Sequence, residues 1–156
     1  MTQITDRAGT ERVGAVLERE LTPTIERWME RVDKVRELTR IPLSYQERTG
    51  HLPQLLEDLI TRLRLQGGEN PPETTSAHDH GKVRSAQGYT VPMLVEESRL
   101  LQVSIFDTLR IHQKNLDANR LMPDVVIIAD ECDAQLKHTV ETFMELEKIG
   151  QKPVAA

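Results

Sequence analysis

The stretch "AHDHGKVRSAQGYTVPMLVEESRLL", residues 77–101, decides the fold of this chain. It divides at Gly88, because glycine readily adopts the left-handed conformation that closes a helix. Tyr89 is then expected to fold back over the last helical turn. Thr90 is expected to cap the next helix, and Pro92 is tolerated in the first turn of that helix. The stretch therefore predicts two helices joined at a tight corner.

Hydrophobic residues recur at helical spacing on both sides of this corner, and no segment shows the alternation of a half-buried strand. A capping box of Ser76 and Asp79 is expected to start the helix that ends before Gly88. Thr39 to Ser44 is expected to be a connector, and the Gly- and Pro-rich residues 67–76 a surface loop. In chain order, the predicted helices cover residues 10–21, 23–35, 53–63, 76–87, 90–115 and 123–148.

Composition agrees with a helical core and limits the classes of partner. Only 3% of the residues are aromatic, so aliphatic side chains must fill the interior. A net charge of −5 without a long basic block argues against nucleic acid and anionic membranes as partners. The 156 residues suit one domain, so we expect a single all-α domain over residues 1–156. Its expected architecture is a bundle of about five to six helices around a four-helix core.

The last predicted helix is the longest. From Pro123 to Lys148 there is no glycine or further proline, which gives a rod of roughly 39 Å at ~1.5 Å per residue. Its hydrophobic positions repeat at close to heptad spacing. We therefore expect residues 123–149 to complete the bundle and to serve as an output or dimerisation helix. Residues 150–156 are expected to form a disordered tail.

Signals for export, membrane insertion and disulfide bonding are missing from the sequence. The N-terminal residues 1–12 lack the apolar core of a signal peptide. No stretch approaches the roughly 18 apolar residues of a membrane span. One cysteine, Cys132, permits no internal disulfide. A cytoplasmic location is the expectation.

Residues that could carry chemistry are few. His78 and His80 are two positions apart and point about 200° away from each other on a helix, so they cannot face one metal ion. Cys132 lies in the hydrophobic stripe of the last helix and is expected to be a core residue. We therefore expect no enzyme activity, no catalytic residue, no metal site and no cofactor. For His80 we expect a structural hydrogen bond in preference to a pH response.

A larger pattern carries a resemblance to a known family. His80-Gly81-x-x-Arg84, Gly88-Tyr89, Leu94, Glu97 and Leu100-Leu101 resemble the N-terminal domain of RsbT co-antagonist (RsbR-type stressosome) proteins. The same domain heads many soluble sensor histidine kinases. The resemblance implies a dimeric, all-helical signal-input domain of a two-component or stressosome protein, whose last helix runs into an effector module or partner. It implies a structural and signalling motif of His80, Arg84, Gly88, Tyr89, Glu97 and Leu101.

Two alternatives stay open. The chain is a histidine-phosphotransfer protein if His78 or His80 accepts a phosphoryl group, although Gly81-Lys82 stands in the reverse order of the signature for that class. Related stressosome domains are globin-like, and a globin-like arrangement would hold haem through a histidine such as His80 or His112.

The spacing within the motif also suggests a contact. His80 and Arg84 are four residues apart and share one helix face, and Glu97 lies near the start of the next helix. If the turn at Gly88 makes these helices antiparallel, Arg84 and Glu97 meet across the seam. We expect this pair, together with Tyr89, to lock the corner.

Overall fold

The computed structural model describes residues 9–66 and 69–150. Within these residues the regular secondary structure is helical, apart from one isolated β-bridge between Glu11 and Leu116. The helices are α1 (Val13–Arg19), α2 (Leu21–Val32), α3 (Arg36–Thr39), α4 (Tyr45–Thr49), α5 (Leu52–Arg64), α6 (Ser76–Ala86), α7 (Val91–Ile111) and α8 (Ala118–Gly150), with a 3-10 turn at Gln113–Asn115. The chain is an all-α helical bundle with a long C-terminal helix, which confirms the predicted fold class.

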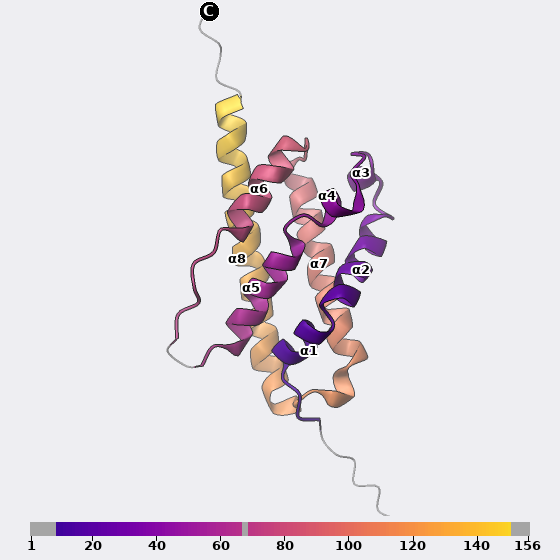
Figure 1. Ribbon diagram of the computed structural model, residues 1–156, viewed down its shortest axis with the longest axis vertical. Helices are drawn as coiled ribbons and strands as arrows, with labels where there is room; N and C mark the ends of the chain where they lie inside the picture. Colours follow the sequence, from indigo (N-terminus) through magenta and orange to yellow (C-terminus); the bar gives the residue numbers. More distant parts are fainter. Residues whose placement is uncertain (1–8, 67–68, 151–156) are drawn as a thin grey trace, which may run out of the picture.

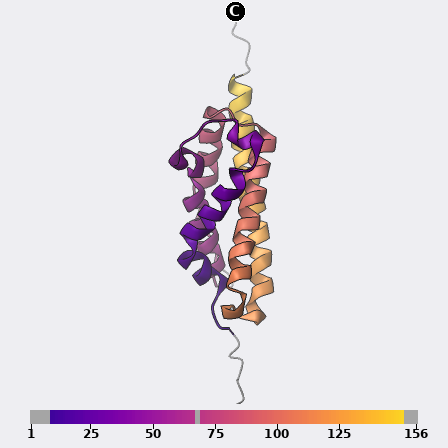
Figure 2. The ribbon, with the colours of Figure 1, turned by 90° about the vertical axis from the view of Figure 1, so that its right-hand side faces the viewer.

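Helix α8 is the longest helix of the bundle. It runs along the whole bundle, and its C-terminal turns extend past the ends of the other helices (Figure 1). Helix α7 runs beside it in the opposite direction, and the helices of the first half of the chain pack against this pair (Figure 2). The most extensive helix–helix packing joins α6 to α8 and α2 to α7. None of the described helices combines the length and the apolar character needed to cross a bilayer.

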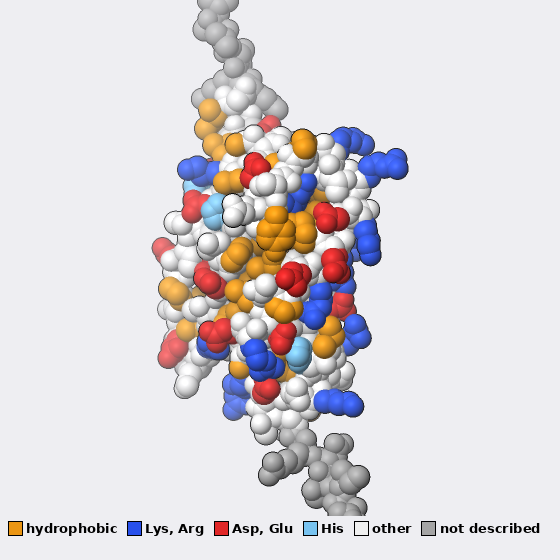
Figure 3. Space-filling model, turned by 45° about the vertical axis from the view of Figure 1, so that its right-hand side comes forward, with side chains coloured by type: hydrophobic (Ala, Val, Ile, Leu, Met, Phe, Trp, Pro, Cys, Tyr) orange, Lys and Arg blue, Asp and Glu red, His pale blue; other side chains and the backbone are white. Residues whose placement is uncertain are grey.

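Aliphatic side chains fill the core, as the composition predicts. The hydrophobic face of α5 matches the prediction in full, since Leu55, Leu56, Leu59, Ile60 and Leu63 are all buried. Trp28 on α2 is completely buried, and its indole Nε1 donates a hydrogen bond of 3.1 Å to the carbonyl of Glu97 on α7. On the surface seen in Figure 3, charged side chains surround a central group of hydrophobic ones.

The boundaries of α8 differ from the prediction. Helix α8 begins at Ala118, and Pro123 lies inside it. A proline near the start of a helix removes only one backbone hydrogen bond, here to the carbonyl of Asn119. The Asp117 carboxylate also accepts a hydrogen bond of 3.0 Å from the Asn119 amide, so the earlier start is stabilised. Gly150, the first residue of the predicted disordered tail, is instead the last residue of α8, and residues 151–156 lie outside the described residues.

The segment before α5 contains short helices that the sequence did not predict. Ser44 and Glu47 form a capping box at the start of α4, with hydrogen bonds of 3.1 and 3.0 Å. The capping box predicted at Ser76 is wrong: α6 is preceded by Thr75, whose hydroxyl donates to the carboxylate of Asp79 and not to the backbone. The predicted surface loop has no helix over residues 69–75.

Candidate functional site

The corner between α6 and α7 forms as its sequence predicts. Gly88 has a φ of 84°, which is the left-handed conformation. The amide of Tyr89 donates to the carbonyl of Arg84 at 3.2 Å, so the chain folds back over the last turn of α6. The Thr90 hydroxyl accepts a hydrogen bond from the amide of Met93 at 3.4 Å and caps α7. These local bonds bring the two helices together at a fixed angle.

Arg84 and Glu97 form a buried ion pair across this corner. Arg84 is completely buried and Glu97 is 4% exposed. The guanidinium donates from Nε to Oε1 and from Nη2 to Oε2 of Glu97, both at 2.9 Å, which is the two-point geometry of a strong pair. Its other donors reach the carbonyl oxygens of Glu47 and Arg48 and the side-chain oxygen of Gln87. The contact expected from the sequence is therefore present, and it extends to α4.

Tyr89 and Arg48 complete this cluster, which we call the corner clamp (Arg48, Arg84, Tyr89 and Glu97). The Tyr89 hydroxyl donates to Glu97 Oε2 at 3.2 Å and accepts from Arg48 Nη1 at 2.9 Å. The Arg84 guanidinium carbon lies 4.6 Å from the centre of the Tyr89 ring, within reach of a cation–π interaction. Arg48 was not predicted, because nothing in its local spacing separates it from exposed arginines nearby.

The electrostatics of the corner clamp follow from its burial. Burial raises the pKa of Glu97, and Arg84 and the Tyr89 hydrogen bond offset part of that effect. Burial, followed by the nearby Glu97 carboxylate, raises the pKa of Tyr89. A buried charge is tolerated only when its partner and its remaining hydrogen bonds are in place. The clamp meets this condition, so it holds α4, α6 and α7 together and is vulnerable to the loss of any one member.

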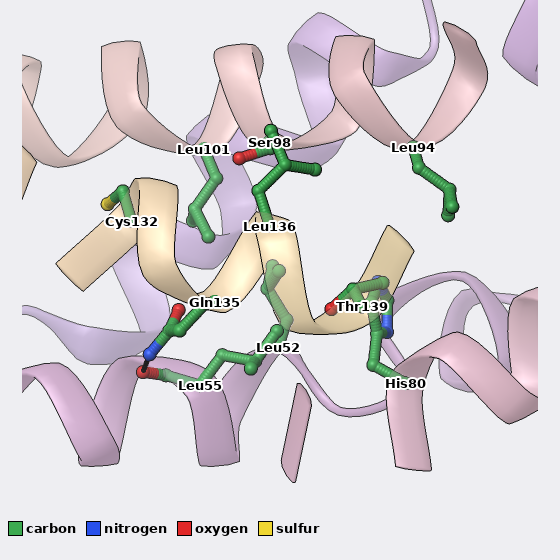
Figure 4. A pocket seen from close by; sticks show the side chains of 10 residues that line it. All are labelled: Leu52, Leu55, His80, Leu94, Ser98, Leu101, Cys132, Gln135, Leu136 and Thr139. Carbon is green, nitrogen blue, oxygen red and sulfur yellow. Dashed lines mark hydrogen bonds between the residues drawn. The ribbon is translucent and has the colours of Figure 1, made fainter. Parts of the chain in front are cut away.

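One turn before Arg84, His80 lines a cavity of about 30 Å³ between α5, α6, α7 and α8 (Figure 4). His80 and Cys132 lie at opposite ends of the cavity. No Asp, Glu, Lys or Arg is among the lining residues. The apolar lining residues are Leu52, Leu55, Leu94, Leu101, Cys132 and Leu136, and the polar ones are His80, Ser98, Gln135 and Thr139.

His80 differs from the other buried polar groups of this region. Gln135 donates to the carbonyl of Leu55 at 2.9 Å, and Thr139 donates to the carbonyl of Ala77 at 3.1 Å. His80 is 8% exposed, and its Nδ1 has no hydrogen-bond partner among the described residues. The structural hydrogen bond that we expected is therefore not found at this nitrogen.

The surroundings of His80 keep its ring neutral. Burial, followed by the charge of Arg84 and the neighbouring His51, lowers the pKa of His80 to about 3. The His51 ring lies edge-on to it at 6.3 Å between centres, and His51 Nδ1 is also buried without a partner. An unsatisfied buried polar group costs about 1–3 kcal/mol. The unpartnered nitrogens therefore lower the stability of α6 beside the cavity, whereas the polar groups of the corner clamp are hydrogen-bonded.

The seam between α6 and α8 is close and polar. A Cβ atom on Gly81 would lie 2.6 Å from the carbonyl oxygen of Thr139, so only glycine fits at this position. His78 Nδ1 and Thr142 Oγ1 share a hydrogen bond of 3.1 Å, and Ser85 donates to Glu147 at 3.1 Å. Local spacing does not predict a packing role for Gly81, because the close approach depends on a helix about sixty residues further along.

The remaining candidate residues lie in positions that do not favour a reaction or cofactor binding. Leu101 is buried in the cavity wall. His112 Nε2 lies 3.4 Å from a carboxylate oxygen of Glu20. A cavity of about 30 Å³ beside His80 is far too small for haem, since pockets for larger ligands measure about 300–1,000 Å³. Burial, with Asp133 and Glu131 nearby, raises the pKa of Cys132 to about 12, so the thiol stays protonated.

Within residues 9–66 and 69–150, no group of three or more His, Cys, Asp or Glu side chains is placed to hold a metal ion. The burial of His80 leaves no room for phosphoryl transfer at its ring, whereas His78 is exposed. Scans against protein-family models, curated proteins and solved structures each find no match. The corner clamp and the cavity therefore carry the functional interpretation.

Proposed function

We propose that this chain is a signal-input domain of a cytoplasmic bacterial signalling protein, such as a histidine kinase or a stressosome regulator. In this proposal the bundle responds to a ligand or partner, and α8 passes a small movement to an effector module. The resemblance of the segment around His80, Arg84 and Glu97 to RsbT co-antagonist N-terminal domains supports it. The domain itself performs no catalysis.

The observation that carries the proposal is the position of α8. Its 33 residues give a rod of about 50 Å. Cys132, Gln135, Leu136 and Thr139 of this helix line the cavity, and its last turns extend beyond the bundle (Figure 1). One long helix thus lines the interior cavity and also extends past the other helices. Shifts of about 1–2 Å at a helix interface are a common means of transmission.

The contrast between the contacts of α6 adds support. Its C-terminal end is bound to α7 by the corner clamp, through Arg84 and Glu97. Its contact with α8 runs through Gly81 and hydroxyl-bearing side chains such as Thr139 and Thr142. This seam is the most extensive helix–helix contact of α8, so a shift of α8 must be accommodated there. We infer that α8 moves against a fixed unit of α6 and α7.

We further propose that the domain works as a homodimer. Several large hydrophobic side chains are exposed on the two long helices, although single exposed residues of this kind are common. Helix α7 contributes Val95 and Val103, and α8 contributes Met122, Val126, Met144 and Ile149. Pairing of the α8 helices would cover part of this surface. Analytical ultracentrifugation with Val126→Glu against Glu141→Gln tests the idea, since only the first change is expected to shift a dimer to monomer.

A fusion experiment tests the signalling proposal. Residues 1–150 are joined directly to the catalytic part of a soluble histidine kinase so that α8 continues into its dimerisation helix, which leaves out Pro153. Gly81→Ala, which forces α6 and α8 apart, is expected to change autophosphorylation, whereas Lys82→Ala on the exposed side is not. A Gly-Pro-Gly insertion after Gly150 is expected to abolish the effect of Gly81→Ala. Equal activity in the folded parent and Gly81→Ala fusions, or an effect that survives the insertion, would contradict the proposal.

A further inference from the structure

We propose that the cavity between α5, α6, α7 and α8 is a binding site for a small uncharged molecule with an apolar body of a few heavy atoms and one hydrogen-bonding group. This inference names a chemical class for the signal. Its signalling consequence rests on the proposed function, while the binding site itself does not.

The lining determines the apolar character of the ligand. Five leucines and Cys132 form most of the wall, and the cavity of about 30 Å³ is partly open to the surface. A water molecule requires about 10–15 Å³ and two to four polar partners. The space therefore exceeds what one water needs, and the five leucines and Cys132 offer water nothing to bond. A short hydrocarbon chain suits such a wall better.

The charges around the cavity exclude an ion. No Asp, Glu, Lys or Arg lines it. The nearest charges in the sequence motif, Arg84 and Glu97, are paired with each other through two hydrogen bonds of 2.9 Å. A charged ligand would lose its hydration without gaining a partner, which is strongly unfavourable.

His80 supplies the hydrogen-bonding part of the site. It is an almost fully buried lining residue, and its Nδ1 lacks a partner among the described residues, as does Nδ1 of the adjacent His51. Buried polar groups are nearly always satisfied, so the unpartnered Nδ1 of a residue that lines the cavity points to a missing partner. This nitrogen is itself buried, so a small rotation of the ring is needed to turn it toward a ligand. A hydroxyl group fits this need, because it donates and accepts and so matches either tautomer of a neutral imidazole.

The same cavity connects a ligand to α8. Leu136 on α8 lines it opposite Leu94 and Leu101 of α7 (Figure 4). Gln135 ties α8 to α5 through the Leu55 carbonyl at 2.9 Å. A molecule inserted between these side chains must displace them, because protein interiors are close-packed. The displaced side chains include that of Leu136, so the displacement acts on α8, the helix that extends beyond the bundle.

The test uses 1-propanol and xenon as probes of the full chain, with 15N-resolved NMR spectra as the readout. Leu136→Phe fills the cavity, and Leu121→Phe makes the same change on α8 outside the lining. Ser98→Leu fills the cavity from α7 and replaces Leu136→Phe if that variant does not fold. His80→Phe keeps a flat ring and removes both nitrogens.

We expect saturable shifts of the amide signals of residues around the cavity with both probes. Filling the cavity is expected to weaken binding at least about tenfold, and Leu121→Phe less than about twofold. His80→Phe is expected to weaken the binding of 1-propanol about fivefold, in line with one lost hydrogen bond, and to change the binding of xenon less than about twofold. Shifts that do not saturate, as for a cavity that holds only water, or equal binding by the filled variant, would overturn the site. Equal loss of both probes in His80→Phe would overturn the hydrogen-bonding role.

The same spectra separate this inference from the proposed function. Probe binding that also shifts the amides of residues 144–150 supports both. Binding without any change at the end of α8 supports the site and contradicts transmission through the rod. Absence of binding overturns the site, and the kinase fusion then decides the proposed function independently.

Discussion

Arg84 and His80 lie one turn apart on the same face of α6, and both are buried, yet their surroundings are opposite. The Arg84 guanidinium has a partner for each of its three nitrogens and joins three helices. His80 Nδ1 has none among the described residues, and the ring borders a cavity. Burial of a polar side chain therefore has different consequences, depending on whether its hydrogen-bonding groups have partners. A fully bonded residue fixes a joint, whereas an unbonded one marks a place where the structure can yield.

The largest expected effect comes from breaking the corner clamp. Arg84→Met keeps most of the side-chain volume and leaves the Glu97 carboxylate buried without its partner. We expect the free energy of unfolding to fall by about 3–5 kcal/mol in urea denaturation. Arg99→Ala, which breaks the exposed pair with Glu96, is the matched control and is expected to leave it almost unchanged.

A charge swap sharpens this prediction. Arg84→Glu combined with Glu97→Arg restores opposite charges across the corner. The double variant is expected to be more stable than either single variant, although less stable than the parent chain, because the carbonyl partners of Arg84 are not recovered. A double variant no more stable than the singles would show that the ion pair does not hold the corner.

The next effect concerns the seam beside His80. Gly81→Ala places a methyl group 2.6 Å from the Thr139 carbonyl oxygen, so α6 and α8 must separate. We expect a loss of about 1–3 kcal/mol in thermal or urea unfolding. The higher helix propensity of alanine acts in the opposite direction by about 0.5–1 kcal/mol, so any net loss reports the steric contact. Increased stability would mean that the helices are not in close contact here.

A pH effect comes third. His80 has a folded pKa of about 3 against an ordinary value of 6.5, so the unfolded chain takes up its proton first as the pH falls. The stability contribution is complete above about pH 6.5 and declines by about 1.4 kcal/mol per pH unit below it, about 2 kcal/mol by pH 5. The difference in unfolding free energy between the parent and His80→Phe isolates this slope. Parallel curves for the two proteins would contradict a buried neutral His80.

The smallest effect is that of His80→Phe at neutral pH. The substitution keeps a flat ring of similar size and removes both ring nitrogens, of which Nδ1 makes no hydrogen bond among the described residues. We expect the unfolding free energy to change by less than about 1 kcal/mol in either direction. A loss as large as that of Arg84→Met would erase the distinction between the two residues.

Local sequence signals were sufficient for the corner. Gly88, Thr90 and Tyr89 act within a few residues of their partners, so turn and capping chemistry predicted their places. The contact between Arg84 and Glu97 followed from helical spacing once the turn was placed. The fold class and the buried face of α5 followed in the same way from periodicity.

Features that depend on distant segments were missed. Arg48 joins the clamp because α4 folds over the corner, and Gly81 is needed because α8 passes within contact distance. The unpartnered nitrogen of His80 is a property of three neighbouring helices, which no spacing along α6 encodes. A proline typically marks the first turn of a helix, so the sequence predicts a start at Pro123, whereas α8 begins at Ala118 with Asp117 as its cap.

Native-state hydrogen exchange along α6 tests the central claim most directly. The amide of Tyr89, bonded to Arg84, is predicted to exchange only through global unfolding. The amides of His80 and Gly81, together with that of Leu136 on the opposite side of the cavity, are predicted to open together at a lower free energy. One common opening free energy for all four amides, or stronger protection at His80 than at Tyr89, would contradict a helix with one fixed end and one yielding end.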